Sequence, residues 1–209
     1  SHITKGEGSC GDRLSCQVAV KQDMEIEVPE EVFGVKKWEC TVRSNENVAT
    51  FIKNLVLELP EGEDVNFRAG GYIQIEAPAH KLSYKEFDVE EEYRPDWDKF
   101  DLWQYDSHVE EPIERAYSIV SAPYEKYLEI FVELVPDGEL TPKMWDLKIG
   151  DLMSVRPRAK GIFTKDKKMH HHFMLSTVTG LAPSMSVVRQ YLHDAGHEGS
   201  EEKQVFYIM

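Results

Sequence analysis

The sequence predicts a β plus α/β fold, in which an antiparallel β-barrel is followed by the start of a doubly wound α/β domain. From Trp38 to about residue 165, short segments alternate apolar and polar residues and are separated by turns, as antiparallel strands are. After residue 165 the strands become continuously apolar, which is typical of buried parallel strands. A glycine turn and a helix separate the last two strands, which is the pattern of a βαβ unit.

The first 37 residues are predicted to hold a hairpin and a linker. "CQVAV" and "MEIEV" alternate in polarity around "KQD", and "PEEVFGVKK" has the composition of a linker. The chain has three cysteines, Cys10, Cys16 and Cys40, without the spacing of a disulfide framework or a zinc finger. Their number and spacing therefore favour a reducing compartment.

The barrel strands are predicted at residues 38–47, 49–59, 72–77, 115–120, 127–135 and 152–164. In the second of these, Ile52, Leu55, Leu57 and Leu59 are expected to mark the buried side. Gly70 and Gly71 precede the third strand and allow a tight turn or a close approach of another segment. Between residues 136 and 151 we expect a turn and a short helix.

That short helix has recognisable start signals. Thr141 is expected to be its N-cap, with Pro142 at the first helical position.

Residues 81–111 interrupt the strand pattern. They mix many acidic residues with Tyr, Phe and Trp and have little periodicity. We interpret the segment as an ordered surface insertion held by its aromatic side chains. The alternative is a docking surface for a partner protein, since long loops in compact domains are sometimes functional.

The predicted βαβ unit consists of "HHFMLSTV", the turn "TGLAP", a helix within residues 184–196 and the strand "QVFYIM". The helix should carry Val187, Val188, Tyr191 and Leu192 on or near one face and end before Gly196. Two strands cover their own sheet poorly, so the pattern suggests an incomplete domain. We expect His170–His172 to form a solvated strand entry rather than a metal site, because adjacent strand residues point to opposite faces.

The formal net charge of −14 disfavours nucleic acids and anionic membrane surfaces as partners. The chain has no apolar run of the length that spans a membrane.

Three short motifs are candidates for ligand binding. The first is "RAYS", Arg115, Ala116, Tyr117 and Ser118, at the start of a strand. Arg115 can pair with phosphate oxygens, Tyr117 can stack on a flat ring, and Ser118 can hydrogen-bond a ring edge. The alternative is that Arg115 pairs with a nearby acid and Tyr117 packs in the barrel wall.

The second motif is "GELT", Gly138, Glu139, Leu140 and Thr141, at the N-terminus of the short helix, where an anion can bind; an ordinary capped helix is the alternative. The third is "TVTGLAP", from Thr177 to Pro183, a glycine-bearing turn between strand and helix. Such turns hold the phosphates of dinucleotides, although a plain tight turn explains the glycine equally well.

Together these motifs resemble those of the ferredoxin-NADP reductase superfamily, in the same order. "RAYS" is similar to its RxYS flavin motif, "GELT" to its GxxS/T pyrophosphate motif, and "TVTGLAP" to its TGTGxAP nicotinamide-nucleotide motif. Residues 13–80 and 94–118 resemble the flavin-binding subunits of sodium-translocating NADH:quinone oxidoreductases. From Ile119 onward the chain is more similar to bacterial ferredoxin or flavodoxin NADP reductases.

The resemblance implies a six-stranded barrel that binds FAD and a following domain that binds NADH or NADPH. Hydride would pass from NADH to FAD, and electrons would then leave singly to an iron–sulfur centre and on to quinone. It divides the chain into residues 1–37, the tail of a ferredoxin-like 2Fe–2S domain with a linker, residues 38–165, the FAD-binding barrel, and residues 166–209, the start of an NAD(P)-binding domain.

The resemblance also implies residue roles. Arg115 would bind FAD phosphate, with Ala116 beside it, and Tyr117 and Ser118 would be the catalytic residues, against the isoalloxazine ring and near its N5 atom. Gly138, Glu139, Leu140 and Thr141 would hold the pyrophosphate. Thr177, Thr179 and Gly180 would line the nicotinamide side.

The chain departs from the resemblance at two places. Cys16 matches the last cluster ligand, but its three partners are missing, so a 2Fe–2S cluster is expected only in the full-length protein. Val178 stands where the nicotinamide motif has glycine, and its branched side chain crowds the turn.

The expected partners are NADH and either other subunits of a membrane quinone reductase complex or a ferredoxin-like acceptor. The expected location is the cytoplasmic side of the bacterial inner membrane, with an anchor upstream. Two alternatives stay open: a soluble ferredoxin or flavodoxin NADP reductase, and a non-catalytic flavin-barrel docking domain.

Overall fold

The computed structural model describes residues 37–161, 163, 168–198 and 204–209, all of which fall in one compact unit, Lys36–Met209. The hairpin predicted around residues 16–28, the linker after it, and Cys10 and Cys16 lie outside the described residues.

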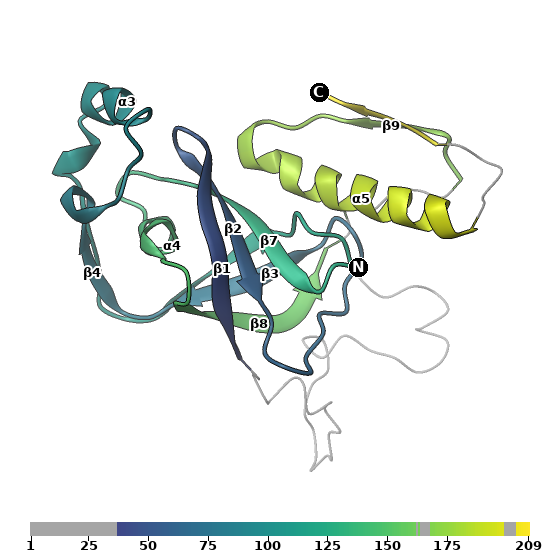
Figure 1. Cartoon of the computed structure of the whole chain (residues 1–209), viewed down its shortest axis with the longest axis horizontal. Helices are drawn as coiled ribbons and strands as arrows, with labels where there is room; N and C mark the ends of the chain where they lie inside the picture. The colour runs from purple at the N-terminus through teal and green to yellow at the C-terminus, as the bar shows by residue number, and fades with distance from the viewer. Residues whose placement is uncertain (1–36, 162, 164–167, 199–203) are drawn as a thin grey trace, which may run out of the picture. The chain divides into compact units, whose positions relative to one another are not determined.

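The described part is built on an antiparallel six-stranded sheet, of which Figure 1 labels β1, β2, β3, β7 and β8. The strand order is β6-β3-β8-β1-β2-β7. Past the end of β6, the N–H of Val120 donates to the carbonyl of Glu129 on β7 at 2.7 Å, so the two edges of the sheet meet as in a barrel. The antiparallel strands predicted from alternation are confirmed. They are β1 (Trp38–Ala49), β2 (Ile52–Glu58), β3 (Tyr72–Ala77), β6 (Ile113–Ser118), β7 (Tyr127–Glu133) and β8 (Leu152–Lys160).

The barrel core follows the two-residue period of the strands. On β2 the inward positions are Lys53, Leu55 and Leu57, so Ile52 was wrongly assigned to the buried side and lies half-buried on the other face. Lys53 is tolerated inside because its ammonium lies 5.1 Å from the ring centre of Trp145 while its stem is buried.

The two glycines before β3 are required by close packing. A Cβ on Gly70, whose φ is +89°, would lie 1.8 Å from the carbonyl oxygen of Phe163. A Cβ on Gly71 would lie 3.0 Å from the carbonyl oxygen of Lys160. The close approach predicted for this pair is confirmed, and it places the end of β8 against the start of β3.

The insertion is ordered around its own aromatic core, as predicted. β4 (His80–Ser83) pairs antiparallel with β5 (Asp106–Val109), and the chain between them forms η2 (Tyr84–Glu86), α3 (Arg94–Lys99) and η3 (Leu102–Gln104). We call the buried side chains of this region the aromatic cluster. Its members are Tyr84, Phe87, Val89, Trp97, Leu102, Leu134 and Trp145.

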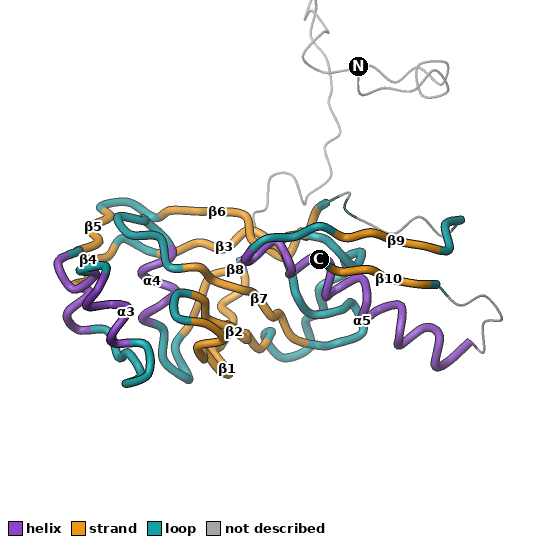
Figure 2. The backbone as a smooth tube through the Cα atoms, turned by 90° about the horizontal axis from the view of Figure 1, so that it is seen from above, coloured by secondary structure: helices purple, strands orange, loops and turns teal. Residues whose placement is uncertain are grey.

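The aromatic cluster is tied to the loop that leads into the short helix. The Tyr84 hydroxyl donates to the carbonyl of Val135 at 3.2 Å, and the Ser107 hydroxyl donates to the carbonyl of Gly138 at 3.2 Å. The insertion therefore supports residues 135–138 from one side, at the end of the molecule where Figure 2 places α3, β4 and β5.

The short helix, α4 (Thr141–Asp146), begins at Thr141, so the predicted N-cap was wrong by one residue. Leu140 occupies the cap position without a side-chain cap bond, and Pro142 is the second helical residue. The Thr141 hydroxyl instead accepts the N–H of Val135 at 3.2 Å. This bond closes the preceding loop, a competing use of a hydroxyl that local sequence cannot distinguish from capping.

The C-terminal part has the predicted βαβ order. β9 (His171–Met174) pairs parallel with β10 (Val205–Ile208), and η4 (Val178–Gly180) and α5 (Leu181–Glu198) lie between them (Figure 2). No helix among the described residues is long and apolar enough to cross a membrane.

Three expectations for this part were wrong. The helix passes through Gly196 and ends at Glu198, and Leu192 points to solvent with 63% of its surface exposed. β9 is parallel but not buried, since Phe173 is 67% exposed. The Phe173 ring stacks on the Tyr207 ring with the ring centres 4.5 Å apart. A two-stranded sheet with one helix can bury only one of its faces, which explains the exposed aromatic pair.

Candidate functional site

A pocket of about 310 Å³ lies where the three sequence motifs meet. β6 contributes Ala116, Tyr117 and Ser118, α4 contributes Thr141, and the turn before α5 contributes Thr179 and Gly180. The other lining residues are Phe131, Glu133, Val135 and Ala182. Segments that lie far apart in the chain thus converge on one cavity.

Arg115 does not line this pocket, although it lies next to Ala116 on the same strand. Its guanidinium is exposed and donates to the Glu139 carboxylate at 2.6 Å and to the carbonyl of Glu114 at 2.9 Å. The ion pair joins the first motif to the second, because Glu139 belongs to "GELT". The pairing of Arg115 with a nearby acid, the alternative raised from the sequence, is present in the structure.

The remaining predicted residues do not line the pocket. The Leu140 side chain is buried in the barrel core, and the N–H of Gly138 is used by a bond of 2.9 Å to the carbonyl of Val135. The carbonyl of Thr177, which precedes η4, accepts the N–H of Gly180 at 2.9 Å, and this bond closes the turn.

Tyr117 and Ser118 both line the pocket, although alternation in a strand places neighbours on opposite faces. β6 ends at Ser118, and the next N–H, from Ile119, donates to the carbonyl of Gly71 at 3.0 Å. Tyr117 also packs against the barrel core. Burial raises the pKa of its phenol to about 12, against the opposing charge of Arg115, so its hydroxyl is protonated and can donate at neutral pH.

The sequence interpretation missed the contribution of β7. Leu128, Ile130 and Val132 are buried in the barrel, so Phe131 and Glu133 face the other way, into the pocket region. The signal was available, because an aromatic residue on the outward face of an alternating strand requires some partner.

Val178 adopts a backbone conformation that suits glycine. Its φ is +51°, in the left-handed region, and its side chain is 52% exposed. For a β-branched residue this conformation is strained. The turn therefore favours glycine at position 178, which is the residue that the nicotinamide-nucleotide motif has at this position.

We expect the Val178→Gly substitution to raise the free energy of unfolding by about 1 kcal/mol, because relief of left-handed strain exceeds the entropy cost of glycine. Urea unfolding measures this change. Val48, equally exposed at 55% but in β1 without a positive φ, is the matched control, and Val48→Gly should destabilise by about 0.5–1 kcal/mol. Equal losses in both variants would contradict strain at Val178.

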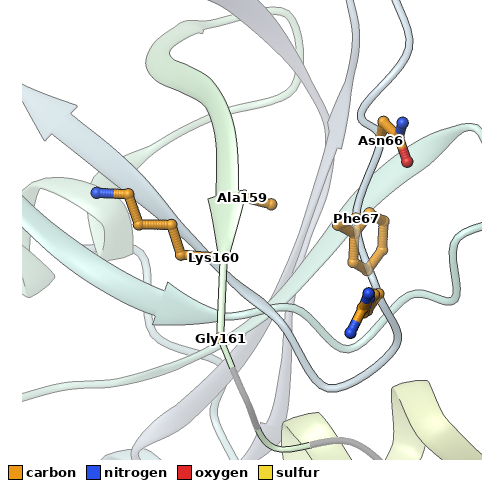
Figure 3. Close-up of a pocket in the computed structure, with 6 residues that line it drawn as sticks. Asn66, Phe67, Ala159, Lys160 and Gly161 are labelled. Atoms are coloured by element: carbon orange, nitrogen blue, oxygen red, sulfur yellow. The ribbon is translucent and has the colours of Figure 1, made fainter. Parts of the chain in front are cut away.

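A second pocket of about 340 Å³ lies at the end of β8 and is lined by Asn66, Phe67, Arg68, Ala159, Lys160 and Gly161 (Figure 3). Figure 3 shows the Lys160 side chain directed away from Asn66 and Phe67. None of the residues predicted from the motifs lines it, so the pocket at the three motifs is the candidate site.

The thiol and imidazole groups of the described residues do not form a metal centre. No group of three His, Cys, Asp or Glu side chains with suitable geometry occurs among the described residues. His171 stacks on Tyr207 and His172 on Phe206, on opposite faces of β9. The proposed cluster ligand, Cys16, lies outside the described residues.

Comparison with known proteins agrees with this arrangement, although no protein-family model matches the chain. The chain is 54% identical over 196 residues to the F subunit of the Na⁺-translocating NADH-quinone reductase of Neisseria meningitidis, a match that covers 89% of this chain and 48% of that protein. The chain thus spans about half the length of the curated relatives it matches.

Two solved structures share the fold. A ferredoxin NADP⁺ reductase from Neisseria gonorrhoeae with bound FAD and NADP superposes with a TM-score of 0.53 and 19% identity, over 84% of this chain and 68% of that one. Phthalate dioxygenase reductase, described as transferring electrons from pyridine nucleotides to [2Fe-2S], superposes with a TM-score of 0.55 and 18% identity, over 87% of this chain and 44% of that one. The chain is therefore similar in sequence to the F subunits of Na⁺-translocating NADH-quinone reductases, and it shares its fold with these two reductases.

Proposed function

We propose that this chain is an FAD-dependent oxidoreductase module that accepts hydride from NADH. The observation that carries the proposal is the pocket shared by β6, α4 and the turn before α5. The wider role, in which single electrons pass to an iron–sulfur centre and on to quinone within a membrane complex at the cytoplasmic face, belongs to the same proposal. It is supported by the sequence identity to the F subunit of the Na⁺-translocating reductase.

The residues at the pocket fit a flavin. The Tyr117 ring offers a flat apolar face, its hydroxyl is a donor at neutral pH, and the Ser118 hydroxyl can donate to or accept from a ring edge. When bound there, FAD would accept a hydride and release electrons one at a time. Thr179 and Gly180, which line the pocket together with β6, would orient the nicotinamide and exclude water.

Arg115 can exchange its partner on binding. Its ion pair with Glu139 is exposed on both sides, at 56% and 58% of the side-chain surfaces, and such a pair contributes about 0–1 kcal/mol. A diphosphate carries more charge and matches the fork of the guanidinium, so it can displace the carboxylate. We infer that Glu139 competes with FAD phosphate for Arg115.

The test is FAD titration of the purified chain followed by anaerobic mixing with NADH. We expect one FAD per chain, with quenched flavin fluorescence, and bleaching of the visible flavin band by NADH. A chain that takes up no FAD would contradict the proposal. Faster bleaching by NADPH than by NADH would instead favour a ferredoxin or flavodoxin NADP reductase.

Two variants of one ion pair sharpen this test, because they should act in opposite directions. Arg115→Gln removes a charge-assisted phosphate contact and should weaken FAD binding about 10- to 100-fold. Glu139→Gln frees the guanidinium and should tighten binding. If both variants leave FAD affinity unchanged, the exposed pair has only a structural role and Arg115 does not bind the cofactor.

A non-catalytic flavin-binding domain is the second candidate, and the left-handed Val178 favours it. Under this alternative the chain binds FAD, but NADH does not bleach it, and the Val178→Gly variant gains the bleaching reaction. Rapid reduction of the unsubstituted chain by NADH would exclude it.

A further inference from the structure

One face of α5 makes a set of polar and aromatic contacts to the barrel. The Ser186 hydroxyl donates to the carbonyl of Ser121 at 2.7 Å, with both residues buried. Arg189 forms ion pairs with Glu129 and, at 3.4 Å, with Glu125. Residues 186, 189 and 193 are spaced by three and four positions and therefore share one helix face.

The third contact of this face is aromatic. The His193 ring stacks on Tyr124 with the ring centres 3.9 Å apart and the planes 12° apart. We call this set of contacts between α5 and residues 121–129 the α5 seam.

The carboxylates that receive Arg189 are held in place by other donors of the barrel. Glu125 accepts the N–H of Ala122 and the hydroxyl of Tyr127, both at 2.7 Å. Glu129 accepts the side-chain amide of Asn54 at 2.9 Å and is only 7% exposed. Because other groups already hold these carboxylates in place, the planar guanidinium of Arg189 can bind them with little further loss of side-chain entropy.

Arg189 and Glu129 depend on each other because Glu129 is buried and Arg189, which is half-buried, supplies its opposite charge. Burial acts to lower the pKa of Arg189, but the hydrogen bond and charge of Glu129, together with Glu125, raise it overall. Removing one partner of such a pair leaves the other charge buried and uncompensated, which is costly.

The α5 seam is adjacent in the chain to two parts of the candidate pocket, the end of β6 and the turn at residues 179–180. Its barrel side begins at Ser121, shortly after Ser118, and its helix begins at Leu181, immediately after the pocket residues Thr179 and Gly180. Ala182, in the first turn of α5, also lines the pocket. A shift of α5 on the barrel would therefore move the turn at residues 179–180 relative to β6.

We propose that Arg189 is a positioning residue, which acts through Glu129 and Glu125 to set the distance between the nicotinamide side and the flavin side of the pocket. The inference rests on the proposed function for its catalytic consequence, but the positioning itself is a property of this chain alone. None of the β6 residues that line the pocket takes part in the seam contacts.

The test compares Arg189→Gln, the conservative Arg189→Lys and the double variant Arg189→Gln/Glu129→Gln with the unsubstituted chain. The control is Leu192→Ala, on the exposed face of the same helix. We expect Arg189→Gln to bind FAD as tightly as the parent while the rate of flavin reduction at saturating NADH falls about 10- to 100-fold, because small misplacements of reacting groups have effects of this size.

Rescue separates positioning from general damage. Arg189→Lys keeps a charge at the seam, and the double variant removes the uncompensated buried carboxylate, so both should recover part of the rate. Unchanged reduction rates in Arg189→Gln would overturn the inference, as would a loss of FAD affinity as large as the loss of rate.

Hydrogen exchange of the backbone amides of α5 tests the positioning role without a measurement of flavin reduction. We expect faster exchange over residues 181–195 in Arg189→Gln, with β1, β2 and β3 unchanged. If NADH does not reduce the unsubstituted chain, the proposed function fails, yet this exchange difference still supports the seam. Identical exchange of α5 in all variants would overturn it, and the double variant supplies the same comparison if Arg189→Gln does not fold.

Discussion

The Trp97→Ala variant is expected to lose about 3–5 kcal/mol of unfolding free energy, the range found when large buried aromatic side chains are truncated. Trp97 is fully buried at the centre of the aromatic cluster. Its ring lies 4.9 Å from Trp103, 6.1 Å from Trp145, and 6.2 Å from both Tyr84 and Phe87. The neighbouring rings could not easily move into the cavity left by the indole, because Tyr84, Phe87 and Trp145 are themselves buried in the same cluster.

The loss should also reach the candidate site. The insertion holds the loop before α4 through the bonds of Tyr84 and Ser107, so a loosened cluster should weaken FAD binding together with stability. Urea unfolding and FAD titration of the same samples measure both effects. Phe100, 53% exposed beside the cluster, is the control, and Phe100→Ala should lose less than about 1 kcal/mol. Equal losses in the two variants would contradict a cluster organised around Trp97.

Alkaline pH is expected to destabilise the folded protein through its buried thiol and phenol groups. Burial raises the pKa of Cys40 from 9.0 to about 12 and the pKa values of Tyr84, Tyr117 and Tyr127 from 10.0 to about 12. The folded state therefore keeps four protons that the unfolded state releases. Stability should be constant below about pH 9 and fall as the pH rises from 9 toward 12.

The size of this effect is several kcal/mol in sum, since one pKa unit corresponds to about 1.4 kcal/mol and the more exposed Tyr127 must be discounted. Chemical unfolding at intervals of about half a pH unit, from about pH 8 to about pH 11.5, measures it. Tyr117→Phe removes one of the four groups and should make the decline shallower. A stability that stays constant up to about pH 11 would show that the four groups can ionise without unfolding.

The strands of the barrel could be predicted because each carries its own period of two, and a buried face is visible in a single segment. The βαβ order was predictable for a different reason, since a glycine turn and an amphipathic helix separate two short apolar segments. The starts and ends of helices were less predictable. The Thr141 hydroxyl had two chemically equivalent uses, capping the helix or closing the loop, and only the fold decides between them.

The candidate site was predictable as a set of segments but not as a set of side chains. The motifs identified β6, the loop at α4 and the turn at Thr179, and one pocket contains all three. The partner of Arg115 depends on a contact across 24 positions, and no local pattern selects Glu139 from the many acids in the chain. The left-handed φ of Val178 is likewise a property of the folded turn, although the departure from glycine at that position was visible in the sequence.

The helix α4 stands between two separate hydrophobic cores. Met144 and Leu147 face the barrel core, whereas Trp145, between them, belongs to the aromatic cluster of the insertion. Shortening residues 81–111 to obtain a minimal barrel would therefore expose the Trp145 side chain to solvent, although Trp145 lies on a helix of the barrel domain. A shortened insertion would therefore need a smaller or polar residue in place of Trp145.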